Sequence, residues 1–259
     1  MNTPAMSSPK GRLFLVPAPL DFMCDTQAPL PQVMPEGSLL IAAQLSHWVC
    51  ENAKSTRALL KRIAVVHPLA CVLQDQRIVE LPLQVHKKGD HAAGLDTSGL
   101  LAPALQGHDM GLVSEAGMPA VADPGSSVVR AAHELGIRVV PLVGPVSLLL
   151  ALAASGLNGQ NFAFVGYLPQ DSAARTQRLR ELENLAAKHG QTQLFIETPY
   201  RNQTLWDALV NGLQGNTRLA RASGLTLASM QVQCKTVQAW RSAGKTPISG
   251  EPTVFLMGK

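Results

Sequence analysis

Residues 111–157 read GLVSEAGMPAVADPGSSVVRAAHELGIRVVPLVGPVSLLLALAASGL and carry the clearest fold signal of the 259-residue chain. Apolar runs typical of strands alternate here with segments typical of helices. The expected elements are a strand at 111–114, a Gly/Pro-rich loop at 115–125, a helix at 126–135, a strand at 138–142, a turn at 143–145 and a helix at 146–154. Strands that alternate with helices predict parallel βαβ units.

The flanking sequence extends this pattern in both directions. Before it, the sequence predicts a strand at 13–17, a Pro-rich loop at 21–37, a strand at 38–45, a helix at 51–63 and a helix at 98–106. After it come predicted strands at 162–168, 193–197, 218–222, 231–237 and 253–257, with helices at 172–188 (capped by Asp171 or Ser172) and 201–213. No clear pattern covers 64–94, of which 86–94 is polar and expected to be exposed.

Several of the late strands follow one another without a full helix, which predicts antiparallel neighbours. We therefore expect an α/β protein of two domains. The N-terminal domain, residues 1–157, is predicted to contain a mostly parallel sheet, and the C-terminal domain, residues 158–259, a mixed sheet. The Gly/Asn-rich stretch at 158–161 is predicted to link them.

The composition narrows the class of protein. Hydrophobic residues make up 46% and charged residues 15%, as in globular chains rather than disordered ones. The net charge of +4 and the pI near 9.0 permit an anionic partner such as RNA. Four cysteines without CxxC spacing, and histidines without HxxxH spacing, give no metal signature, so no metal site is expected. The polar N-terminus lacks a signal-peptide core, and Pro141, Gly144 and Pro145 interrupt the uncharged stretch at 139–157, so a cytoplasmic protein without a membrane span is expected.

Two loops are candidates for ligand binding, at 114–125 and 143–147. Each follows a predicted parallel strand, and the two strands are expected to be neighbours. Open α/β sheets bind ligands at the carboxyl ends of their strands, and glycines such as Gly117 and Gly125 allow close backbone approach. A nucleoside-sized ligand fits this pattern, whereas ordinary turn chemistry is the alternative reading of the same glycines and prolines. Neither GxGxxG nor GxxxxGK[ST] is present, which argues against dinucleotide and P-loop sites.

Several motifs resemble a known family. LVSEAGMPAVADPG at 112–125 resembles LVSDAGTPxISDPG, and FIETPYR at 195–201 resembles FYEAPHR. The segments GIRVVPLVGPVSLLLALAASGL (136–157) and NFAFVGYLP (161–169) resemble further motifs of the same proteins, and CENAKSTRALL (50–60) weakly resembles their EDTRxTxxLL helix. These motifs belong to the ribosomal RNA 2′-O-methyltransferase (RsmI-type) branch of the tetrapyrrole methylase superfamily.

The resemblance implies a homodimer of two-domain α/β subunits, each with S-adenosylmethionine in the cleft between its domains. Carried over by position, the expected cofactor-binding residues are Ser114, Glu115, Ala116, Gly117, Pro119, Gly144, Pro145, Ser147, Val165, Gly166, Tyr167 and Leu168. Phe164 extends the last group, and Pro199 faces the same cleft. If the acceptor is a ribose hydroxyl, the candidates for orienting it are Glu51, Glu197 and Arg201; the alternative is that Glu197 and Arg201 pair with each other or cap a helix.

The substrate side departs from the family. The motif TPIGNLxD is replaced by APLDFMCD at 18–25, and EDTR by Glu-Asn-Ala-Lys at 51–54. The sequence therefore predicts an S-adenosylmethionine-dependent methyltransferase, with structured RNA as the first candidate acceptor. A small molecule (tetrapyrrole-like) or a protein is the alternative acceptor, and a catalytically inactive cofactor-binding protein is a further alternative. Arginines of the helix at 172–189 are candidate phosphate contacts, or part of a solvated face that includes Glu181 and Glu183.

Overall fold

The computed structural model describes residues 9–82, 90 and 95–259. Contacts divide the chain into two compact units. The first comprises Met1–Phe22 and Ala28–Pro145, and the second comprises Met23–Gln27 and Val146–Lys259. The predicted boundary after Leu157 differs from this division, because the helix that precedes Leu157 packs on strands of the second unit. The exact limits of the two domains stay a prediction.

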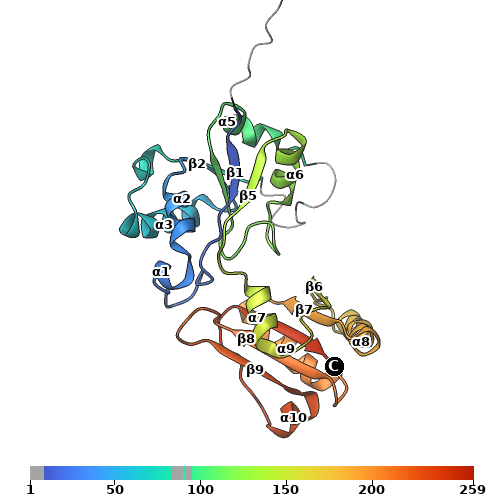
Figure 1. The fold of residues 1–259 in the computed structure, drawn as a ribbon. Coiled ribbons are helices and arrows are strands. Elements are labelled where there is room, and N and C mark those ends of the chain that lie inside the picture. Colours follow the sequence, from blue (N-terminus) through green and yellow to red (C-terminus); the bar gives the residue numbers. More distant parts are fainter. Residues whose placement is uncertain (1–8, 83–89, 91–94) are drawn as a thin grey trace, which may run out of the picture. The chain divides into compact units, whose positions relative to one another are not determined.

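A parallel five-stranded sheet forms the centre of the first unit, with strand order β3-β2-β4-β1-β5 (Figure 1). Its strands are β1 Arg12–Leu15, β2 His47–Cys50, β3 Arg77–Glu80, β4 Met110–Val113 and β5 Arg138–Pro141. Its α-helices are α1 Leu30–Val33, α2 Glu36–Ala43, α3 Ala53–Val66, α5 Ala102–Leu105 and α6 Ser126–Glu134, joined by the 3-10 turns η1 Leu73–Asp75 and η2 Ser98–Leu101. The predicted mostly parallel sheet is confirmed.

Helices cover both faces of this sheet, with α2 and α3 on one side and α6 on the other (Figure 1). Side chains of a strand alternate between the faces, so Phe14 of β1 joins the core under α2 and α3 and Leu13 joins the core under α6. Burial on both faces explains why β2 and β4 consist of fully buried residues. Gly111 of β4 is required beside Trp48, since an added Cβ atom would lie 2.4 Å from the indole ring.

One predicted strand is wrong: residues 38–45 lie mostly in helix α2. Their continuous apolar run has no strong periodicity, so its pattern does not distinguish a buried strand from a buried helix. Pro35 precedes the helix and Glu36 occupies its first turn, both of which favour a helix start. Two strands were not predicted: β2, and β3 within the stretch 64–94 that showed no clear pattern. The predicted loop at 21–37 contains the short helix α1.

The second unit contains a mixed sheet with strand order β6-β7-β10-β8-β9, which confirms the prediction. Strands β6 and β7 are parallel and the other neighbours are antiparallel. Its elements are β6 Phe162–Tyr167, β7 Thr192–Ile196, β8 Arg218–Ser223, β9 Gln231–Thr236, β10 Thr253–Gly258, α7 Ser147–Ser155, α8 Ser172–His189, η3 Pro199–Arg201, α9 Asn202–Gly212 and α10 Val237–Ser242.

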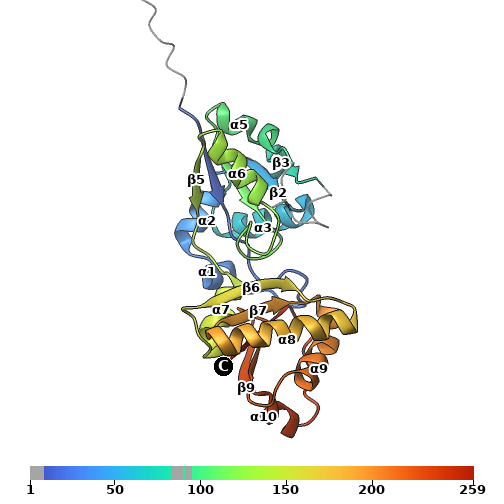
Figure 2. The same cartoon turned by 90° about the vertical axis from the view of Figure 1, so that its right-hand side faces the viewer.

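Figure 2 shows α8 running across the sheet of the second unit. This helix packs with α9 and α10 on a core that includes Trp206 and Trp240. The two indole rings pack edge to face, with 4.9 Å between their centroids. Helix α7 contacts β8, β9 and β10. Asp171 caps α8 as predicted, because its side chain accepts a hydrogen bond from the backbone N–H of Ala174.

The uncharged stretch at 139–157 forms parts of β5 and α7 with a turn between them, as predicted. Within the described ranges, no helix combines the length and the apolar character needed to cross a membrane.

Asp90 is buried at the start of α6, which corrects the expectation that the polar segment 86–94 is exposed. Its carboxylate accepts hydrogen bonds from the backbone N–H groups of Gly125 and Ser127 and from the hydroxyls of Ser126 and Ser127, at 2.7–2.9 Å. Burial alone raises the pKa of Asp90, but these hydrogen bonds together outweigh it and lower the pKa below its ordinary value. The other residues of 86–94 lie outside the described residues.

We expect Asp90→Ala to destabilise the protein by about 2–3 kcal/mol, because four donors at a helix start lose a charged acceptor. Since the folded-state pKa is lowered, the stabilisation is present above the ordinary carboxyl pKa and is lost as the pH falls through the folded value. Urea unfolding at neutral and acidic pH measures both effects. Asp96→Ala is the matched control, because Asp96 is exposed and its hydrogen bonds come from a single residue, Ser98; equal losses in the two variants would contradict the prediction.

Candidate functional site

The first candidate site lies at the carboxyl edge of the first sheet, where the loops after β4, β1 and β5 meet. The strands β4 and β5 were expected to be neighbours, and this is wrong, because β1 lies between them. The two loops nevertheless meet around the segment that leaves β1. Ala18 and Gly117 exchange backbone hydrogen bonds of 2.8 and 2.9 Å, and a Cβ atom added to Gly117 would lie 3.8 Å from the carbonyl oxygen of Pro145.

Gly144 packs tightly against the same segment. A Cβ atom added to Gly144 would lie 2.2 Å from Cγ of Pro17 and 3.4 Å from Sδ of Met34. Because a proline ring cannot turn aside as a flexible side chain does, glycine is required at this position. The turn after β5 is thereby held against the segment that follows β1.

The loop at 114–125 has an unusual backbone. Gly117 and Gly125 have φ angles of 70° and 136°, and Ala120 and Ala122 both have φ of 65°. Alanine rarely adopts positive φ, and each such residue costs roughly 1–3 kcal/mol. Strained backbone of this kind concentrates at functional sites, so the two alanines favour a binding role for the loop over a simple turn.

Ser114 and Glu115 begin this loop. Ser114 is 5% exposed, and its hydroxyl has no hydrogen-bond partner among the residues that the structure describes. Buried hydroxyls are normally hydrogen-bonded, so this oxygen is available to a ligand atom. The backbone N–H of Glu115 donates to a carboxylate oxygen of Glu51 at 3.2 Å, which places Glu51, a catalytic candidate, at the same sheet edge.

A third carboxyl group, Asp123, was not singled out from the sequence. Burial, and then the negative charges of Glu51 and Glu115, raise the pKa of Asp123 to about 7. The sequence signal that could have identified Asp123 is its position inside the motif ADPG. A carboxyl group that titrates near neutral pH is suited to proton transfer.

The second candidate site lies in the second unit, at the common carboxyl edge of the parallel strands β6 and β7. Tyr167 at the end of β6 pairs in register with Ile196 at the end of β7. A bulge separates Phe164 from Tyr167, and Gly166 within it has a φ of 73°. The expected cofactor-binding residues at 165–168 therefore lie at the same edge as Glu197, which follows β7.

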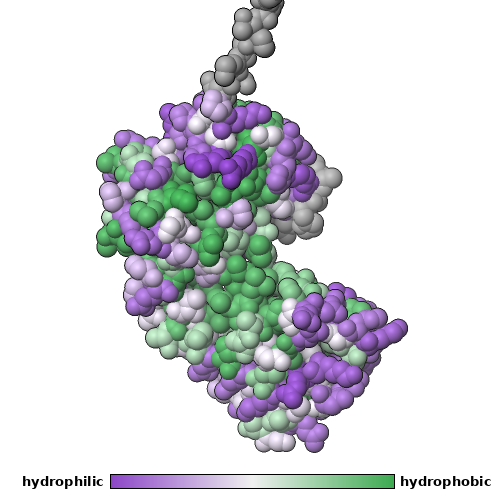
Figure 3. Space-filling model, viewed as in Figure 1, coloured by the Kyte–Doolittle hydropathy of each residue, from purple (hydrophilic) through white to green (hydrophobic). Residues whose placement is uncertain are grey.

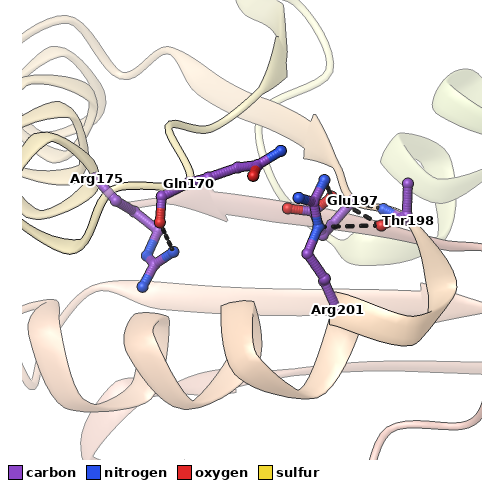
Figure 4. Close-up of polar contacts among 5 residues, drawn as sticks. All are labelled: Gln170, Arg175, Glu197, Thr198 and Arg201. Atoms are coloured by element: carbon purple, nitrogen blue, oxygen red, sulfur yellow. Dashed lines mark hydrogen bonds and ion pairs between the residues drawn. The ribbon is translucent and has the colours of Figure 1, made fainter.

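Figure 4 shows Glu197, Thr198 and Arg201 as one hydrogen-bonded group. The guanidinium of Arg201 donates to a carboxylate oxygen of Glu197 at 2.7 Å and to the Thr198 hydroxyl at 3.2 Å. The same oxygen of Glu197 accepts from the backbone N–H of Thr198 at 2.7 Å. The alternative that Glu197 and Arg201 pair with each other is thus confirmed. Figure 4 also shows Arg175, whose guanidinium donates to the carbonyl oxygen of Gln170 at 3.1 Å.

The structure thus places the predicted site residues in two groups. The first unit holds Glu51, Ser114, Glu115, Ala116, Gly117, Pro119, Gly144 and Pro145. The second unit holds Ser147, Val165, Gly166, Tyr167, Leu168, Glu197, Pro199 and Arg201. Contact of either group with a cofactor stays a prediction. Over the described ranges, no cluster of three or more His, Cys, Asp or Glu side chains is arranged to hold a metal ion.

Comparison with other proteins places this geometry in a family. The family "Tetrapyrrole (Corrin/Porphyrin) Methylases" matches residues 65–238. Ribosomal RNA small subunit methyltransferase I of Pseudomonas aeruginosa is 29% identical over 252 residues, covering 96% of this chain and 79% of the relative. The protein of the same name from Halalkalibacterium halodurans is 30% identical over 251 residues, covering 96% and 76%. With the Mesorhizobium japonicum protein, identity is 37% over 150 residues, which is 58% of this chain and 50% of the relative.

Solved structures share the fold. The methyltransferase CobJ matches with a TM-score of 0.55 and 17% identity, covering 96% of this chain and 94% of its own. A uroporphyrin-III C-methyltransferase from Thermus thermophilus, solved with S-adenosylhomocysteine, matches with a TM-score of 0.53 and 15% identity, covering 96% and 98%. With a matching family pattern over more than half of its length and a relative 30% identical along nearly all of it, the chain belongs to the tetrapyrrole methylase family of methyltransferases.

Proposed function

We propose that this protein transfers a methyl group from S-adenosylmethionine to a ribose 2′-hydroxyl of ribosomal RNA, in the cytoplasm and as a homodimer. The observation that carries the proposal is the meeting of the loops around Gly117 and Gly144 at the carboxyl edge of the first sheet. The relatives that match most of the chain are named ribosomal RNA small subunit methyltransferases, which supports RNA over a small-molecule acceptor.

The residues of the first site suit a polar nucleoside. The buried hydroxyl of Ser114 has an unused hydrogen-bonding capacity among the described residues, and the loop after it has left-handed backbone at Gly117 and Ala120. Bound S-adenosylmethionine supplies an electrophilic methyl group on a sulfonium. The work of the protein is then to align the acceptor oxygen with that methyl group and to keep water out, and alignment alone can supply several orders of magnitude in rate.

A hydroxyl acceptor must also lose its proton. Carboxylates accept protons, and Glu51, Glu115 and Asp123 interact electrostatically at this sheet edge. Asp123 is our candidate for the proton acceptor, because its pKa of about 7 keeps much of it ionised at neutral pH and makes it a stronger base than an ordinary carboxylate. Glu197 and Arg201 hold each other in place and are proposed to orient the acceptor rather than to take its proton.

The proposal is tested with methyl-labelled S-adenosylmethionine and small-subunit ribosomal RNA from a strain that lacks the protein. Label is expected in RNA incubated with the purified protein, and ribose-specific digestion should locate it on a 2′-oxygen. Calorimetry with S-adenosylhomocysteine tests the cofactor site separately. Binding without transfer to RNA, small-molecule or protein fractions would favour an inactive cofactor-binding protein, and no binding would end the proposal.

A further inference from the structure

Helix α3, Ala53–Val66, has an unusually one-sided charge. It contains four basic residues and no acidic one. Lys54, Arg57 and Lys61 are exposed and lie at positions i, i+3 and i+7, which places them on one face of the helix over roughly 10 Å. These three residues are called the α3 basic face below.

The α3 basic face has no ion-pair partner among the residues that the structure describes. The fourth basic residue differs, because Arg62 forms a bidentate contact with the buried carboxylate of Asp21 at 2.9 Å. Glu80, an acidic residue at the helix start, accepts a hydrogen bond from the backbone N–H of Ala53 at 2.6 Å. Three cations are therefore held in a row without a matching row of carboxylates.

Helix α8 also carries several basic residues, but acidic residues lie among them. Arg178 pairs with Glu181 at 3.2 Å, and Arg175 donates to the backbone carbonyl of Gln170. Helix α3 thus differs from α8 in having no acidic residue among its basic ones. Glu181 is exposed on α8, but Glu183 is buried and accepts hydrogen bonds from the backbone N–H of Gln214 and the hydroxyl of Thr217, so the expected solvated face does not include Glu183.

The α3 basic face also begins at the candidate site. Helix α3 starts directly after β2, and Glu51 in the connection accepts the hydrogen bond of Glu115 from the loop after β4. In Figure 3 the surface of the first unit over α2 and α3 carries hydrophilic and hydrophobic patches side by side. A chain of phosphates that follows α3 would therefore lead to the carboxyl edge of the first sheet.

We propose that the α3 basic face docks the sugar-phosphate backbone of the RNA acceptor and guides one of its nucleotides to the site beside Ser114. This inference rests on the proposed function, and it adds a binding surface outside the motifs that predict the cofactor site. Lysine and arginine in a row match the repeated charge of a phosphate backbone, and such contacts fix the position of RNA without reading its sequence.

The test replaces the three basic residues together, as Lys54→Gln, Arg57→Gln and Lys61→Gln in the full-length protein. Affinity for deproteinised small-subunit ribosomal RNA is measured across a salt series. We expect the variant to bind on the order of 30- to 100-fold more weakly at ~0.15 M salt, with a salt slope smaller by about two to three. Affinity for S-adenosylhomocysteine should not change.

The matched control removes the same charge from the opposite edge of the same sheet, as Lys10→Gln, Arg77→Gln and Arg138→Gln. Arg77 and Arg138 open β3 and β5, and Lys10 lies just before β1. The control should retain the RNA affinity and salt slope of the unmodified protein to within about 3-fold, since only long-range attraction is lost.

A second variant, with Lys54→Arg, Arg57→Lys and Lys61→Arg, keeps the charge and should retain the salt slope, which excludes simple misfolding as the cause of weak binding. If the unmodified protein binds and methylates RNA while the Gln variant keeps its affinity and slope, this inference is wrong and the proposed function stands. If the unmodified protein binds no RNA, both fail. A Gln variant that loses binding to anionic phospholipid vesicles and keeps binding to RNA would also overturn the inference.

Discussion

Replacing Gly144 with alanine is expected to weaken binding of S-adenosylhomocysteine by about 10- to 100-fold, because a methyl group at this position overpacks the turn by about 1–3 kcal/mol. The added Cβ atom would lie 2.2 Å from Cγ of Pro17, and the proline ring is bonded to its own backbone nitrogen and cannot turn aside. To avoid this steric clash, the turn after β5 must move away from the segment that follows β1. Gly117 and Pro145, which meet there, would then separate.

Gly37→Ala is the matched control. Gly37 lies in α2 of the same unit, and a Cβ atom added there meets nothing within 4 Å. Alanine is favoured over glycine in a helix by roughly 0.5–1 kcal/mol, so this variant should unfold at a slightly higher temperature and bind unchanged. Calorimetric titration and thermal melts of both variants make the comparison. A Gly144→Ala protein that is destabilised and yet binds with unchanged affinity would show that the turn lies outside the cofactor site.

The features that the sequence predicted correctly depend on local chemistry. Gly117 and Gly144 mark turns because glycine tolerates positive φ or close contact with other backbone. This preference of glycine can be recognised from the sequence without knowledge of the fold. Alternation of strands and helices likewise predicted the parallel sheet. Pairing between Glu197 and Arg201 was anticipated as an alternative because i, i+4 spacing brings such side chains together at a helix start.

The features that were missed depend on the order of strands in space. Nothing local shows that β1 inserts between β4 and β5, because the chain leaves β1 long before it forms either neighbour. The same order brings Glu51, Glu115 and Asp123 to one edge, and the raised pKa of Asp123 follows from that assembly rather than from its own sequence context. Helix α2 was mistaken for a strand because apolar residues occupy its exposed side as well, at Leu40, which removes the period that distinguishes the two structures.

Replacing Asp123 with asparagine is expected to stabilise the protein by about 2–4 kcal/mol at pH ~8 and by much less at pH ~4.5. The pKa of Asp123 rises from 3.8 to about 7 on folding, so the protonated form is favoured in the folded state. Below the ordinary pKa the group is protonated in both states and costs nothing. Between the unfolded and folded pKa values, the carboxyl group is ionised in the unfolded chain but still protonated in the folded protein. The free energy of unfolding therefore falls as pH rises through this range, and above the folded pKa the destabilisation is complete. Asparagine does not ionise and avoids the cost.

Urea unfolding across this pH range measures the difference between the two proteins. Asp75→Asn is the control, since Asp75 is exposed at the end of η1 and the same substitution there should change stability by less than about 0.5 kcal/mol at either pH. A difference between Asp123→Asn and the unmodified protein that stays constant with pH would mean that the side chain is not held among the charges of Glu51 and Glu115.

The same substitution distinguishes a structural role from a chemical one. If Asp123 accepts the proton of the acceptor hydroxyl, Asp123→Asn should lower the rate of methyl transfer by about 10²- to 10⁴-fold while S-adenosylhomocysteine still binds. The unmodified protein should gain activity as pH rises through about 7, where Asp123 ionises, and the variant should lack this step. Gain of stability and loss of rate in one variant is the behaviour expected of a residue kept for catalysis at the expense of the fold. A variant that is more stable and equally active would leave Asp123 without a part in proton transfer and would move the search for the base to Glu51.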